Sequence, residues 1–149
     1  MKKLLFVVLT CFFSLPLPAF SYGPYSLIAP IAIDGDTIRA EVPVWPSIGV
    51  DASIRVIGVD SPELTSPGCA TQAENDAIRA AGRAAKVFTD SWLSRNTPIV
   101  ITGVKMDAYA GRYDAVVLGS DGEKLADALI KSGHGRKYNG GKRATWCAP

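Results

Sequence analysis

Alternating apolar and polar positions predict β-structure in the first part of the chain. The alternation over residues 26–45 is interrupted by Asp34-Gly35, and an Asp-Gly step between two such runs is typical of a tight turn. A turn-like segment at residues 45–49 leads into an apolar run over residues 54–59. That run ends before Ser61-Pro62, because proline lacks a backbone donor and restricts the residue before it. The pattern predicts three strands before residue 61.

The rest of the chain shows helical spacing and shorter apolar runs. Apolar residues recur mostly at steps of three and four over residues 71–93, with charged residues between them, which predicts a long amphipathic helix. Two further strands are expected over residues 98–104 and 113–118, and a short helix over residues 123–131. From Lys131 onward the chain is basic and contains no acidic residue.

This order of elements predicts a mainly β protein with helices, of the α+β class. Five short strands, with a long helix after the third and a short helix near the C-terminus, suit a five-stranded OB-type barrel. A split α+β sheet is the alternative. The choice rests on element order alone, and a fold of this kind does not by itself specify an activity.

The N-terminus has the features of a secretory signal peptide. Lys2 and Lys3 precede a short apolar block, and small residues precede a processing site after Ser21. We therefore expect residues 1–21 to be removed, leaving residues 22–149 as one exported domain, periplasmic or secreted from a bacterium. Because the apolar block is short and broken by proline, no membrane association is expected after processing.

Removal of this segment changes how charge and cysteine content are interpreted. The chain has 16 Lys+Arg and 14 Asp+Glu, so its net charge of +2 belongs to Lys2 and Lys3 and does not indicate a partner. Cys69 and Cys147 remain after Cys11 is lost, which suggests one disulfide in an exported protein. Free thiols, a link between two chains, or lipidation of Cys11 are the alternatives. A single histidine excludes a His-rich zinc site.

Two carboxylate-rich segments are candidates for chemistry. Asp34 and Asp36 are two residues apart, so on a strand they point to the same side, although Asp-Gly is also a common turn. Arg55 lies inside an apolar strand, and Asp60 and Glu63 follow its end. An arginine and an aspartate five apart on a strand point to opposite faces unless the strand bends. The alternative is a solvated arginine followed by an ordinary turn.

Together these segments resemble the staphylococcal nuclease (thermonuclease) family. The resemblance rests on Asp34-Gly35-Asp36-Thr37, on Arg55 with Asp60-Ser61-Pro62-Glu63, and on Asp107-Ala108-Tyr109-Ala110-Gly111-Arg112. It covers roughly residues 28–138. Differences from the family pattern are a longer stretch before Arg55, serine at position 61 in place of threonine, an extra residue at Ala110, and an end soon after the short helix.

The resemblance implies hydrolysis of DNA or RNA phosphodiesters in an OB barrel with calcium. By residue match, Asp36, Asp60 and the carbonyl of Ser61 would hold Ca²⁺, with Mg²⁺ the less expected ion, and Asp34 would lie beside it. Glu63 would orient or deprotonate the attacking water. Arg55 and Arg112 would bind the scissile phosphate through their planar guanidinium groups.

The sequence therefore predicts a monomeric, Ca²⁺-dependent endonuclease of low sequence specificity. Further nucleic-acid contacts are candidates at Tyr113, Arg136, Lys137 and Tyr138, although Tyr113 also suits a core position and the tail residues a solvated surface. The rival interpretation is a non-catalytic OB-fold module that binds nucleic acid. Carboxylates repel phosphate unless a cation lies between them, so the acidic motifs favour catalysis over binding alone.

Overall fold

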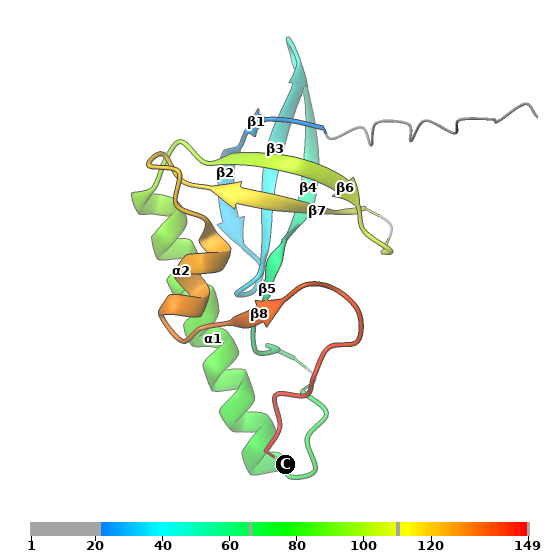
Figure 1. The fold of residues 1–149 in the computed structure, drawn as a ribbon, viewed down its shortest axis with the longest axis vertical. Helices are drawn as coiled ribbons and strands as arrows, with labels where there is room; N and C mark the ends of the chain where they lie inside the picture. Colours follow the sequence, from blue (N-terminus) through cyan, green and yellow to red (C-terminus); the bar gives the residue numbers. More distant parts are fainter. Residues whose placement is uncertain (1–21, 66, 110, 149) are drawn as a thin grey trace, which may run out of the picture.

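A barrel-like sheet with two helices at its side forms the body of the protein (Figure 1). The structure, a computed structural model, describes residues 22–65, 67–109 and 111–148. The predicted signal peptide and the extra residue Ala110 lie outside the described residues. The elements, in chain order, are β1 (Tyr25–Ser26), β2 (Ile28–Ala32), β3 (Thr37–Trp45), β4 (Ile48–Val56), β5 (Gly58–Asp60), α1 (Gln72–Arg95), β6 (Val100–Met106), β7 (Arg112–Leu118), α2 (Leu125–Lys131) and β8 (Arg136–Tyr138).

The main sheet is nearly closed on itself. Its six strands follow the order β1-β6-β7-β4-β3-β2, and only Leu27 separates the two edge strands β1 and β2 in the chain. Neighbouring strands are antiparallel except β4 and β7, which run parallel. Strands β5 and β8 form a separate two-stranded sheet below the barrel (Figure 1). The protein thus has a mixed α/β fold with a barrel-like sheet.

The strand count differs from the five expected from the sequence. The apolar run over residues 54–59 is divided between β4 and β5, because Gly58 adopts a positive φ of 101° that ends the strand. The basic tail supplies β8, which has no alternation of apolar and polar residues by which it could be predicted. Strand β4 also begins six residues earlier than expected, at Ile48, because β3 and β4 form one long hairpin.

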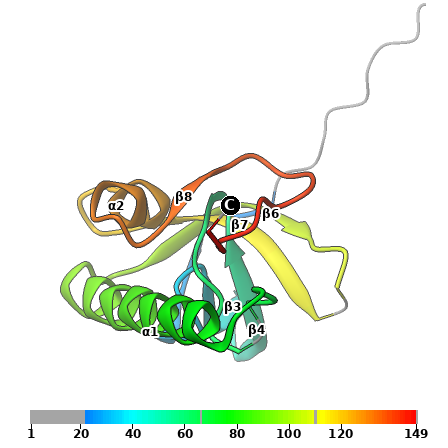
Figure 2. The same cartoon turned by 90° about the horizontal axis from the view of Figure 1, so that it is seen from below.

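The two helices lie on the same side of the barrel, as the view from below shows (Figure 2). The long helix was expected over residues 71–93, and Thr71 caps its start in a reciprocal pair of hydrogen bonds with Glu74. Its buried residues Trp92 and Leu93 join Leu125 and Leu129 of α2 and the inward-facing strand residues in one apolar core. No helix in the described part of the chain is long and apolar enough to cross a membrane.

The predicted disulfide between Cys69 and Cys147 is confirmed, with an S–S distance of 2.03 Å. It joins the loop before α1 to the end of the chain, 78 residues later. The C-terminal segment therefore runs back beneath the barrel toward the start of α1 (Figure 1). This places the basic tail beside Asp60 at the end of β5 and beside Glu63 in the loop that follows.

Candidate functional site

A bend between β4 and β5 brings Arg55 and Asp60 together. On a straight strand these residues would point to opposite faces, but the positive φ of Gly58 redirects the chain after Val56. As a result, Nη2 of Arg55 lies 3.8 Å from Oδ1 of Asp60. The bend that the sequence required for a shared site is present, and glycine is the residue best able to adopt its conformation.

The acidic turn between β2 and β3 is fixed against α1. The Thr89 hydroxyl donates a hydrogen bond to the Gly35 carbonyl at 2.7 Å. A Cβ at Gly35 would lie 2.7 Å from the side chains of Ala85 and Ser61, so only glycine fits between them. The helix therefore sets the position of the turn that carries Asp34 and Asp36.

The same helix also supports the loop after β5. A Cβ at Gly82 would lie 2.8 Å from the Pro62 carbonyl oxygen and 2.9 Å from that of Glu63. Small residues on one face of α1 thus allow both acidic segments to approach the helix backbone closely. In the sequence, Gly82 and Ala85 look like ordinary small residues of an amphipathic helix, and nothing in their spacing indicates this role.

Asp36 and Arg55 form the buried centre of the site. Their side chains are 4% and 10% exposed, and Nη2 of Arg55 donates to Oδ2 of Asp36 at 3.0 Å. The Ser61 N–H donates to the same oxygen at 2.9 Å. Burial raises the pKa of the Asp36 carboxyl to about 6, although the positive charge of Arg55 opposes this shift. A cation beside Asp36 would offset the cost of keeping this carboxylate ionised.

Arg112 reaches the same site from the start of β7. Its guanidinium pairs with the carboxylate of Asp107 and lies 4.8 Å from the centre of the Tyr109 ring. The hydrogen bond from Arg112 holds the pKa of Asp107 below its usual range. Asp107 and Arg112, which both belong to the motif that carries part of the family resemblance, thus contact each other, and Arg112 lines the same cavity as the other predicted residues.

These side chains surround one cavity of about 650 Å³. Five carboxylates and three arginines line it, so its wall carries an excess of negative charge. The lining includes six of the residues expected from the sequence to form the catalytic and metal site, namely Asp34, Asp36, Arg55, Ser61, Glu63 and Arg112. Asp107, Tyr109, Asp114, Tyr138 and Arg143 complete its polar wall.

Asp60 is the predicted ligand that does not line this cavity. Its Oδ2 accepts hydrogen bonds from Arg136 at 2.9 and 3.1 Å and from the Trp146 indole at 3.0 Å. Its Oδ1 is buried and accepts no hydrogen bond within the described residues. One carboxylate oxygen thus anchors the tail through hydrogen bonds, while the other lies 3.8 Å from Nη2 of Arg55 and 3.4 Å from Nε of Arg143.

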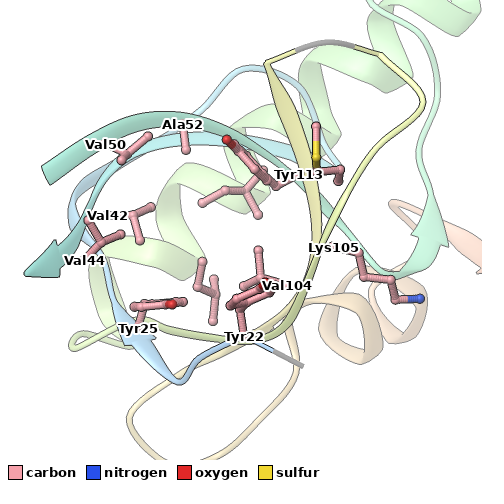
Figure 3. A pocket seen from close by; sticks show the side chains of 12 residues that line it. Tyr22, Tyr25, Val42, Val44, Val50, Ala52, Val104, Lys105 and Tyr113 are labelled. Atoms are coloured by element: carbon pink, nitrogen blue, oxygen red, sulfur yellow. The ribbon is translucent and has the colours of Figure 1, made fainter. Parts of the chain in front are cut away.

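The four proposed nucleic-acid contacts lie in four different environments. Tyr138 lines the polar cavity, whereas Lys137 is exposed on β8. Arg136 binds Asp60 and covers the Trp146 ring at 4.1 Å. Tyr113 lies elsewhere, in an apolar cavity of about 210 Å³ enclosed by the barrel strands (Figure 3).

Arg143 also lines the polar cavity, although the sequence indicated only that it belongs to the basic tail. Its Nη1 donates to Glu63 at 3.0 Å, and its Nε lies 3.4 Å from Oδ1 of Asp60. The disulfide is the sequence signal that could have found it. Cys69 lies six residues after Glu63, and Cys147 four residues after Arg143, so linking the cysteines brings the two charged side chains into the same neighbourhood.

The donor set is compatible with a hard divalent cation. Among the described residues, no three His, Cys, Asp or Glu side chains form a metal-binding cluster. The set expected from the sequence, however, needs only two carboxylates and a backbone carbonyl, with water completing the coordination. Oδ1 of Asp60, which accepts no hydrogen bond within the described residues, the desolvated carboxylate of Asp36 and the acidic wall all fit such an ion.

Comparison with known proteins identifies no relative that would assign this site. No family model matches the chain, and no curated protein sequence matches it. The functional conclusion therefore depends on the motifs and on the geometry of the cavity.

Proposed function

We propose that the protein is a Ca²⁺-dependent nuclease of the staphylococcal nuclease type, hydrolysing phosphodiester bonds of DNA or RNA with low sequence specificity. The observation that carries this proposal is that Arg55 and Arg112 line the same cavity as Asp36 and Glu63. The barrel is interpreted as an OB fold, in which β1 and β2 together take the place of one strand. Mg²⁺ is the less favoured ion.

The chain's own residues supply the parts that phosphodiester hydrolysis needs. Arg55 is held in place by Asp36, and its fixed guanidinium suits the negative charge that builds on a phosphate under attack. Arg112 provides a second guanidinium. Glu63 is exposed to the cavity, where its carboxylate can accept a proton from water. A bound cation, held by Asp36, Asp60 and the Ser61 carbonyl, would polarise the phosphate and lower the pKa of water.

The cavity wall also distinguishes this proposal from a nucleic-acid-binding module without catalysis. Five carboxylates beside three arginines would repel a polyanion in the absence of a cation. A module that only binds phosphate gains nothing from desolvating Asp36. The repulsion among these carboxylates and the desolvation of Asp36 are explained if the site binds a metal ion that acts on the phosphate.

The test is a cleavage assay on plasmid and single-stranded DNA and on RNA, with Ca²⁺, with Mg²⁺ and with chelator. We expect degradation in Ca²⁺, none with chelator, and a rate reduced by about 10² or more in Glu63→Gln. Glu41→Gln is the matched control, because Glu41 is exposed on β3 and does not line the cavity. Cleavage that survives chelation would contradict the metal requirement, and binding without cleavage under every metal would favour the rival function.

A further inference from the structure

The C-terminal strap, defined as residues 139–148, contributes to the wall of the polar cavity. Gly140, Gly141 and Arg143 of the strap line that cavity together with Tyr138, the last residue of β8. The strap is fixed at three points. Cys147 is bonded to Cys69, Trp146 donates to Asp60, and Arg136 donates to the Thr145 carbonyl at 2.8 Å. It is therefore a built part of the cavity wall.

Arg143 is the arginine of the cavity that can most easily change partner. Its side chain is 33% exposed, and its partner Glu63 is 46% exposed. An ion pair this accessible to water contributes little stability. A phosphate could therefore replace Glu63 at small cost while Nε of Arg143 keeps its contact with Oδ1 of Asp60 at 3.4 Å. Arg55 differs, because it is buried against Asp36 and cannot leave without exposing two unpaired charges.

We propose, building on the proposed nuclease function, that the strap is part of the substrate site and that Arg143 binds a phosphate of a single-stranded nucleic acid. On binding, Arg143 exchanges Glu63 for the phosphate, which frees the carboxylate that the proposed function assigns to water. The Tyr138 ring, 5.9 Å from the Arg143 guanidinium, supplies a face on which the neighbouring base can stack. The disulfide holds both groups in place.

The decisive measurement is the affinity for a fluorescent single-stranded oligonucleotide in Ca²⁺, by anisotropy, over a range of salt concentrations. It is made in an Arg112→Ala background, so that the probe is not consumed. Arg143→Gln is compared with Lys142→Gln, which removes the same charge from the neighbouring exposed position outside the cavity. We expect Arg143→Gln to raise Kd about tenfold and to make the salt dependence shallower by about 0.7 in log–log slope, the value for one phosphate contact. Lys142→Gln should change Kd less than twofold.

Each outcome decides the inference separately from the nuclease proposal. The role of Arg143 would be contradicted if the two substitutions had equal effects on Kd, or if neither had an effect. It would also be contradicted if neither the wild type nor the Arg112→Ala background bound the probe. Selective loss with Arg143→Gln would support it even if the wild type cut nothing. A Cys69→Ser/Cys147→Ser variant, checked for folding by circular dichroism, should lose affinity as Arg143→Gln does. If this folded variant, made in the same Arg112→Ala background, binds as tightly as its disulfide-bonded counterpart, the disulfide does not hold the binding groups in place.

Discussion

The two faces of strands β4 and β7 carry opposite chemistry. These strands are paired in parallel, with Ile54 opposite Tyr113 and Arg55 opposite Asp114. Ile54 and Tyr113 line the apolar cavity inside the barrel (Figure 3), whereas Arg55 and Asp114 line the polar cavity outside it. The same backbone thus supports a core on one side and the candidate site on the other, so substitutions at adjacent positions should have separable effects.

The largest effect is expected at Arg55, which serves both the fold and the site. Arg55→Ala leaves the buried carboxylates of Asp36 and Asp60 without their shared partner. We expect the free energy of unfolding to fall by about 3 to 5 kcal/mol and hydrolysis to be lost. Denaturant titration and a cleavage assay on the folded fraction measure the two consequences. Unchanged stability would show that the polar face is not held together by this arginine.

The inner face should affect stability alone. Ile54 is fully buried, so Ile54→Ala should lower the free energy of unfolding by about 2 to 5 kcal/mol through lost burial and an enlarged cavity. The cleavage rate per folded molecule should remain close to wild type. Urea titration followed by an assay at a temperature where the variant is folded checks this. A large loss of rate in the folded variant would mean that the two faces are coupled.

A smaller effect on stability, with a clear effect on activity, is expected at Gly82. Gly82→Ala brings a methyl group against the Pro62 and Glu63 carbonyls. This overpacking should lower the free energy of unfolding by about 1 to 3 kcal/mol. The higher helix propensity of alanine offsets about 1 kcal/mol of that loss. We expect the displaced loop to lower the cleavage rate about tenfold. Ala81→Ser, at the exposed neighbouring position, is the control. Wild-type cleavage by Gly82→Ala would show that the helix does not position Glu63.

The smallest predicted effect is the pH dependence of Asp36. Burial raises its pKa in the folded protein from 3.8 to about 6, so protonation favours the folded state. Its contribution to stability is therefore fully present below the unfolded value and is lost as the pH rises through about 6. With chelator present, wild type should gain about 1 kcal/mol relative to Asp36→Asn between pH 6 and pH 5. Thermal unfolding of both proteins measures the difference, and a change of opposite sign would contradict it.

The spacing of apolar residues in the sequence predicted the inner face of the barrel better than the outer face that carries the candidate site. Alternation and helical spacing depend on burial, so they located the helix that begins after Thr71 and the hairpin around Asp34-Gly35. The motif residues were also recognisable, because carboxylates and an arginine interrupt apolar runs. Only tertiary packing reveals that Gly82 leaves room for the carbonyls of Pro62 and Glu63, or that Asp60 accepts a hydrogen bond from Trp146. Strand β8 could not be predicted, since its charged residues carry no apolar pattern.

The most direct measurement compares cleavage by two variants at adjacent positions on opposite faces of β7. Arg112→Ala and Tyr113→Phe are assayed on single-stranded DNA in Ca²⁺, after their folding has been checked by thermal unfolding. We predict that Arg112→Ala remains folded and loses about 10² to 10³ in rate, the cost of removing one donor to developing charge, and that Tyr113→Phe cleaves at the wild-type rate. Wild-type cleavage by Arg112→Ala, or equal losses in both variants, would contradict the assignment of the polar cavity as the site of hydrolysis.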